Sequence, residues 1–197
     1  MSATAQSPEP PAPSDFVEDV PPQSSWKEPL RIPAFRLLCV TQLATGMRMP
    51  MAFINGTNDF AYPMDSYAKS CALVRTEKNY SIQLRMRHGH IFDFPEFFPF
   101  VDQYLKGGVP MPVVSSPELK AGQLIAQVKA STKLISARLH YTTGSHTENK
   151  ARPWTTKNLA VDGHSIKGDS PPKEATAWYV DLTDERKVLV SSQVMVR

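Results

Sequence analysis

Two short apolar segments, each followed by a polar loop, constrain most strongly what this chain can fold into. Residues 51–54 (MAFI) form a continuous apolar run, as expected for a strand buried on both faces of a parallel sheet. The run ends in a polar turn that contains Gly56 and Asp59. A second short strand, expected over residues 80–84, opens into a loop with two histidines, His88 and His90. The sequence therefore predicts an acid and a histidine at the ends of neighbouring strands.

A helical segment follows each of these strands. Pro63 stands where a first-turn proline belongs, and Asp65 lies where an acid suits the helix dipole, so a helix is predicted over residues 64–74. Pro95 opens a second helix with a dense apolar stripe. The order strand, helix, strand, helix over residues 50–107 predicts an α/β arrangement.

The pattern changes after residue 110, where short alternating segments are separated by turn-prone residues. Such strands at this spacing predict a small antiparallel β-sandwich. The expected segments are residues 124–130, 134–141, 175–182 and 188–196.

The N-terminal stretch has a different composition. Residues 1–33 are rich in Pro, Ser, Glu and Asp, and we expect them to be disordered because they offer little apolar surface to bury. The predicted organisation is a Pro-rich segment at 1–33, a partial α/β domain at 34–108 and a β-sandwich domain at 109–197. Residues 35–44 are too short an apolar run to span a bilayer.

Asp59 is the predicted catalytic acid. A triad acid has to be fixed by the backbone so that it can orient a histidine, and a turn after a parallel strand does this. The alternative is a turn aspartate that satisfies its own backbone. Asp65 is a weaker candidate, since a place in the first turn of a helix explains it.

His90 is the predicted general base. Gly89 lets the loop turn tightly before His90, and the residues after His90 lead into the last helix. His88 is expected to support it from the same loop. The alternative is a pair of loop histidines with no chemistry.

A metal site is the rival interpretation of the same loop. His88, His90 and Asp93 are ligand types at short spacing, but a His-x-His-x-Asp-His cluster would need a different spacing and one more histidine. The other histidines, His140, His146 and His164, are expected at the surface. We predict no cofactor and no metal.

The order of these motifs resembles a known family. Residues 53–63 (FINGTNDFAYP) resemble the acid-bearing strand and loop of bacterial α/β-hydrolases of the acetylxylan esterase, dienelactone hydrolase and prolyl oligopeptidase-like group. Residues 86–90 (MRHGH) resemble their histidine loop. Residues 177–186 (AWYVDLTDER) resemble the C-terminal β-sandwich of planctomycete-type esterases and of PhoPQ-activated pathogenicity-related proteins.

The resemblance implies a fold and an activity. The fold would be α/β: the C-terminal portion of an α/β-hydrolase parallel sheet followed by a small antiparallel β-sandwich. The activity would be hydrolysis of a carboxylic ester, either a small ester or an acetylated polysaccharide, through Ser, His and Asp. By this analogy Asp59 orients the base and His90 takes the serine proton.

The nucleophile of that family is missing from the chain. No Gly-x-Ser-x-Gly elbow occurs in the 197 residues. We therefore expect a truncated hydrolase whose activity as an enzyme is uncertain, and whose strand at residues 51–54 has an exposed edge. A complementing N-terminal hydrolase chain is the partner that this interpretation implies.

A non-catalytic binding module is the alternative function. Trp154, Trp178 and Tyr179 could stack on sugars, although packing in a core is the favoured explanation for them. The net charge of +3 is small and its basic residues are scattered, which argues against nucleic acid as a partner.

The remaining features bear on location. No signal peptide is visible, so the chain taken literally is cytoplasmic, and it is periplasmic or secreted if its N-terminus has been lost.

Cys39 and Cys71 form neither a metal nor a disulfide framework, and we interpret both as buried small residues or free thiols.

Overall fold

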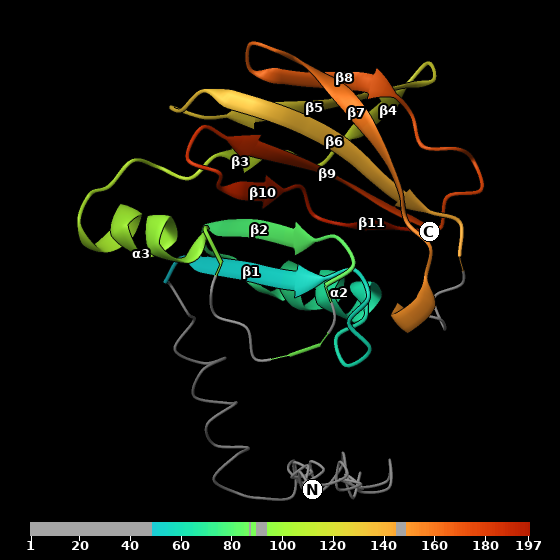
Figure 1. Cartoon of the computed structure of the whole chain (residues 1–197), viewed down its shortest axis with the longest axis horizontal. Coiled ribbons are helices and arrows are strands. Elements are labelled where there is room, and N and C mark those ends of the chain that lie inside the picture. Colours follow the sequence, from blue (N-terminus) through green and yellow to red (C-terminus); the bar gives the residue numbers. More distant parts are fainter. Residues whose placement is uncertain (1–48, 87, 90–93, 145–148) are drawn as a thin grey trace, which may run out of the picture. The chain divides into compact units, whose positions relative to one another are not determined.

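The computed structural model describes residues 49–86, 88–89, 94–144 and 149–197. Residues 47–197 form one compact unit, and its described part consists mainly of strands: eleven strands in one mixed, curled sheet and two short α-helices (Figure 1). The predicted α/β-hydrolase fold is therefore wrong. A helix-covered parallel sheet is absent from the described residues, because nearly every strand pairs antiparallel with its neighbour.

The strands follow the order β1-β2-β10-β9-β6-β7-β8-β5-β3 across the sheet, with β11 paired to β9 and β4 to β5. The helices and strands are β1 (Met51–Gly56), α2 (Met64–Leu73), β2 (Lys78–Gln83), α3 (Phe97–Leu105), β3 (Val113–Val114), β4 (Glu118–Lys120), β5 (Gln123–Lys129), β6 (Leu134–Thr142), the 3-10 helix η3 (Asn149–Ala151), β7 (Thr155–Asp162), β8 (Ser165–Asp169), β9 (Ala177–Asp184), β10 (Leu189–Ser191) and β11 (Met195–Val196).

The local predictions fare better than the fold class. The predicted helix at 64–74 and the strands at 124–130 and 134–141 correspond to α2, β5 and β6 within one or two residues. Strands β7 and β8 were not predicted. Strand β7 is exposed along almost its whole length, so its sequence carries no alternation of buried and exposed side chains from which to recognise it.

Strands β1 and β2 are the one parallel pair among the described strands, as the sequence predicted. Met51 lies opposite Lys78, and Gly56 lies opposite Gln83. At the end of this pair the chain after β2 passes directly over Gly56, where an added Cβ would overlap the carbonyl oxygen of Met86. Glycine is therefore required at position 56, and the crossing brings the histidine loop against the loop after β1.

Two apolar clusters stabilise the unit. The larger lies within the antiparallel strands and includes Leu124, Leu139 and Val180. The smaller joins helix α2 to the rest of the unit, because Cys71 packs with Ile82, Trp154 and Tyr179. Strand β2 also pairs with β10, so the sheet runs across the predicted boundary near residue 108. The division into domains at 34–108 and 109–197 stays a prediction.

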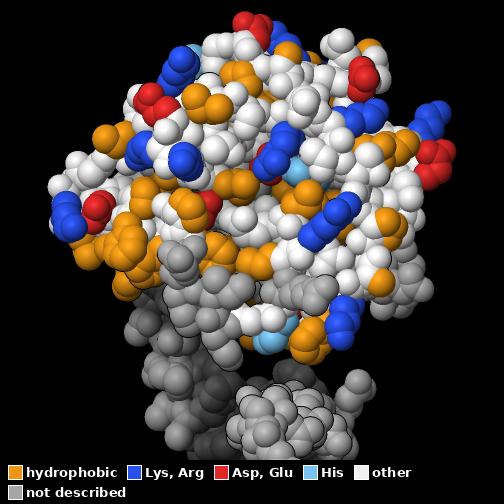
Figure 2. Space-filling model, in the orientation of Figure 1, with side chains coloured by type: hydrophobic (Ala, Val, Ile, Leu, Met, Phe, Trp, Pro, Cys, Tyr) orange, Lys and Arg blue, Asp and Glu red, His pale blue; other side chains and the backbone are white. Residues whose placement is uncertain are grey.

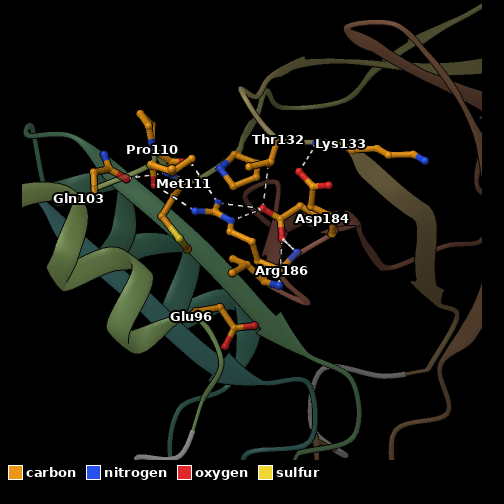
Figure 3. Close-up of polar contacts among 12 residues, drawn as sticks. Glu96, Gln103, Pro110, Met111, Thr132, Lys133, Asp184 and Arg186 are labelled. Atoms are coloured by element: carbon orange, nitrogen blue, oxygen red, sulfur yellow. Dashed lines mark hydrogen bonds and ion pairs between the residues drawn. The ribbon is translucent and has the colours of Figure 1, made fainter. Parts of the chain in front are cut away.

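The turn between β9 and β10 is tied to the chain after α3 (Figure 3). The buried carboxylate of Asp184 accepts hydrogen bonds from Thr132 Oγ1 at 2.8 Å and from Nε of Arg186 at 2.8 Å. The same guanidinium donates to the carbonyls of Val109 at 3.0 Å and Pro110 at 3.2 Å. Arg186 thus links a buried acid to a segment that has no strand partner of its own.

Candidate functional site: the Asp59 and His88 pair

Asp59 lies in the loop after β1 and its side chain is buried. Its Oδ1 accepts hydrogen bonds from the backbone N–H groups of Ala61 at 2.8 Å and Tyr62 at 3.0 Å. This is the turn geometry that aspartate adopts after a strand, and it fixes the direction of the carboxylate. Asp59 can therefore satisfy the backbone of its own turn and also serve as a catalytic acid.

His88 lies in the loop after β2 and its imidazole faces Asp59. Its Nδ1 is 3.2 Å from Oδ1 and 3.1 Å from Oδ2 of that carboxylate. A carboxylate can only accept, so Nδ1 carries the proton, and Nε2 is the basic nitrogen of the neutral ring. The His88 side chain is 32% exposed, so solvent reaches part of it.

Two aromatic side chains flank the histidine. The ring of Phe60 meets the imidazole edge-on at 5.2 Å between centroids, and the ring of Tyr62 lies at 5.7 Å. Both aromatic residues are largely exposed. They limit the rotation of the His88 ring and present an apolar surface beside it.

The structure brings Asp59 together with His88. His90, the predicted base, and Asp93, a candidate ligand in the rival metal interpretation, lie outside the described residues, so the role of His90 stays a prediction and the rival interpretation stays untested. The Gly56 crossing could have indicated His88, because it places Met86 on top of β1 and a single residue separates Met86 from His88. Asp65 lies in the first turn of α2, as predicted, and is 3.8 Å from Lys69.

No group of three potential metal-ligating side chains occurs within the part of the chain that the structure describes. No helix in that part is long and apolar enough to cross a membrane. Cys71 is buried, as expected, whereas Cys39 and His146 lie outside the described residues.

His140 was predicted at the surface, and this is wrong. It is fully buried on β6, with Nε2 2.8 Å from Asp181 Oδ2 and Nδ1 2.9 Å from Thr156 Oγ1. Arg138 donates two further hydrogen bonds to the Asp181 carboxylate, at 3.0 and 2.7 Å, and these raise the pKa of the guanidinium. This second aspartate–histidine pair is closed to solvent and links β6, β7 and β9. His164 is exposed, as predicted.

The three aromatic residues proposed as a sugar-binding surface lie in the core. Trp154, Trp178 and Tyr179 are all buried, and Tyr179 stacks on His140 at 4.9 Å. Packing explains their presence, so they cannot form an exposed platform for a sugar.

The chain was also compared with known protein families, curated proteins and solved structures. No family and no curated protein matches it. It is similar to the crystal structure of pectate lyase PelI from Erwinia chrysanthemi in complex with tetragalacturonic acid, at 13% identity and a TM-score of 0.26. The match covers 44% of this chain and 27% of that chain. A similarity of this size indicates neither a shared fold nor a shared activity.

Proposed function

We propose that Asp59 and His88 form the acid–base half of a serine-hydrolase-type site that hydrolyses a carboxylic ester. The observation that carries the proposal is the contact of His88 Nδ1 with both carboxylate oxygens of Asp59, at 3.2 and 3.1 Å. The carboxylate is itself held by two backbone amides, and the two residues follow neighbouring parallel strands.

In this proposal the basic nitrogen of His88 takes the proton of an attacking hydroxyl as the new C–O bond forms. Asp59 holds the ring in the tautomer that leaves Nε2 basic, and it stabilises the imidazolium. The imidazolium then returns the proton to the departing alkoxide as the ester C–O bond breaks. When the hydroxyl is that of water, the acid and the alcohol leave and the pair is regenerated. When it belongs to a polypeptide, the acyl group stays on that hydroxyl until water, deprotonated by His88 in the same way, displaces it.

The chain carries no Gly-x-Ser-x-Gly elbow, so in this proposal the attacking hydroxyl comes from water or from another polypeptide. Among the described strands, β1 pairs with β2 alone and forms one end of the sheet. A strand of a complementing chain that paired parallel to β1 along this edge would end beside the Asp59 loop. Its substrate would be a small ester or an acetylated polysaccharide.

The test is turnover of p-nitrophenyl acetate by the purified chain beside four variants. We expect a rate above that of buffer, which His88→Ala abolishes and Asp59→Asn lowers. His164→Ala is the matched control, since His164 is exposed and distant in sequence from the pair, and it is expected to leave the rate unchanged. His90→Ala shows which loop histidine acts. A His88→Ala rate equal to that of the unmodified chain would refute the proposal.

The alternative function is a β-sandwich module that binds carbohydrate or protein. One observation favours it: β7 exposes nearly all of its side chains, and its first half, which includes Thr156 and Asn158, presents a polar surface. Retention of the purified chain on insoluble xylan would support the carbohydrate form. Elution of the purified chain with the unbound fraction would rule out carbohydrate binding as its function.

A further inference from the structure

A basic pocket lies beside the Asp59–His88 pair. Its volume is about 300 Å³, and it is lined by Asn58, Arg85, Lys150, Ala151, Arg152 and Pro153. Asn58 directly precedes Asp59, and Arg85 lies three residues before His88. In Figure 1 the 3-10 helix η3, which contains Lys150, lies next to the loops that follow β1 and β2.

Hydrogen bonds hold the two sides of this pocket together. The Asn58 side chain donates to the carbonyl of Arg152 at 3.1 Å and to that of Lys150 at 3.3 Å. The backbone N–H of Arg85 donates to Thr57 Oγ1 at 2.7 Å, in a turn where Arg85 has a φ of 60°. These hydrogen bonds therefore join three segments into one surface: the loop after β1, the turn after β2 and the segment around η3.

Among the described residues, the lining includes three basic side chains, Arg85, Lys150 and Arg152, and no acidic one. Arg85 and Lys150 are exposed, and within the described residues neither has an acidic partner at ion-pair distance. Arg152 is buried, and this burial lowers the pKa of its guanidinium, while the charge of Asp65 acts in the opposite direction. Guanidinium and ammonium groups gathered in a small concave site attract anionic oxygen groups.

Phe60 connects one residue of the pocket lining, Lys150, to His88. The ammonium of Lys150 lies 6.0 Å from the centroid of the Phe60 ring, and that ring packs against the His88 imidazole. Figure 2 shows a histidine, apolar side chains and a basic side chain close together at the lower edge of the unit. A ligand held by the basic side chains would thus extend along the Phe60 ring toward His88.

We propose that this pocket binds an anionic oxygen group of the substrate, so that the site takes acidic esters in preference to neutral ones. The bound group is a carboxylate or a phosphate, since both offer the paired oxygens that guanidinium groups recognise. The assignment of this anion to the substrate rests on the proposed function. Binding of the anion itself depends only on the pocket.

The first experiment measures binding by calorimetric titration of the full chain with succinate and, separately, with inorganic phosphate. Arg85→Gln with Lys150→Gln removes two charges and leaves the buried Arg152 in place. Lys157→Gln with Lys173→Gln is the matched control, because it removes the same charge from exposed lysines outside the pocket. Lys150→Gln alone serves as the second variant if the Arg85 change disturbs folding.

We expect the unmodified chain to bind one anion. The affinity of the pocket variant should be weaker by about tenfold or more, because each lost contact is a hydrogen bond to a charged group. The control pair should bind as the unmodified chain does. Tighter binding of succinate assigns a carboxylate, and tighter binding of phosphate assigns a phosphate. A dissociation constant above about 10 mM for the unmodified chain, or equal weakening in the control pair, would overturn the proposal.

A second measurement separates this inference from the proposed function. His88→Ala should retain anion binding while any ester turnover is lost. If the unmodified chain turns over esters, the ratio of kcat/KM for p-nitrophenyl hemisuccinate to that for p-nitrophenyl butyrate should fall about tenfold in the pocket variant. An unchanged ratio with weakened anion binding would show that the anion is not part of the substrate, and would overturn the inference while leaving the acid–base proposal intact.

Discussion

His88 presents Nδ1 to both carboxylate oxygens of Asp59, at 3.2 and 3.1 Å, although the two residues come from loops after different strands. Asp59 Oδ1 also accepts two backbone N–H groups, so the carboxylate cannot rotate freely. The imidazole is the more exposed partner and rests between Phe60 and Tyr62. A fixed acid beneath a partly exposed base is the geometry that general-base chemistry requires.

The first prediction concerns the tautomer of His88. In Asp59→Asn the amide oxygen is expected at the Oδ1 position, where Ala61 and Tyr62 donate to it. The amide NH₂ then takes the Oδ2 position and donates to Nδ1, so the ring proton moves to Nε2. The ¹⁵N shifts of the His88 ring in a long-range ¹H–¹⁵N correlation measure this change. Asp65→Asn is the control and should leave the ring unaffected; an Nδ1–H tautomer in Asp59→Asn would contradict the prediction.

The second prediction concerns the buried acid in the turn between β9 and β10. Asp184→Ala leaves Thr132 Oγ1 and Nε of Arg186 without their acceptor, and we expect the free energy of unfolding to fall by about 3 kcal/mol. Urea denaturation measures it. The matched control is Asp162→Ala, which removes an exposed ion pair with Lys167 and should leave the urea midpoint unchanged. Similar losses in the two variants would contradict the role assigned to burial.

The third prediction concerns the pH dependence of stability. Burial raises the pKa of Glu96 above its usual 4.5, while the hydrogen bond from the Leu189 N–H, at 3.0 Å, acts against it. The folded chain therefore binds more protons than the unfolded chain between pH 4.5 and the raised pKa. Its free energy of unfolding should fall as the pH increases through this window.

Glu96→Gln tests this dependence directly. The neutral amide keeps an oxygen that can accept from Leu189 N–H but has no charged form to desolvate. The variant should lose the part of the pH slope that Glu96 causes, and it should gain stability over the unmodified chain as the pH rises above 4.5. Urea midpoints measured in steps up to neutral pH compare the two chains. Parallel pH profiles would contradict the assignment.

The fourth prediction concerns the reactivity of Cys71. Burial raises the pKa of this thiol from 9.0 to about 11, and the side chain is inaccessible in the core next to α2. The shift alone lowers the rate of thiolate reactions below pH 9 by about 100-fold, since each pKa unit is a factor of ten. A Cys39→Ser variant leaves Cys71 as the one thiol for reaction with a disulfide reagent. The reaction should be slow in buffer and fast in urea; equally fast reactions would show that Cys71 is accessible.

Several local elements were predictable because the residues that define them are neighbours in sequence. The apolar run before Asn55 indicated β1, and Pro63 with Asp65 indicated the start of α2. The sequence also indicated that Asp59 follows a strand and that a histidine loop follows the next. These features depend on propensities and on spacing within a few residues.

Other features depend on pairing between distant segments. Strand β7 has no alternating pattern, and its partners β6 and β8 define it. The sequence predicts His140 at the surface. In the structure it lies in the core, where Asp181 and Thr156 are hydrogen-bond partners of its two ring nitrogens. The parallel β1–β2 pair suggested an α/β sheet, but β10 joins β2 antiparallel and extends the sheet in a different way.

The sequence by itself determined where β1, β2 and α2 form and placed an acid and two histidines in the loops that follow the strands. Only the tertiary structure decided that His88 meets Asp59, that Arg85, Lys150 and Arg152 line one pocket, and that the sheet is mixed. The physical reason is the range of the forces involved. Propensity and turn chemistry act between sequence neighbours, whereas strand pairing, burial and the Gly56–Met86 crossing depend on contacts between residues far apart in the chain.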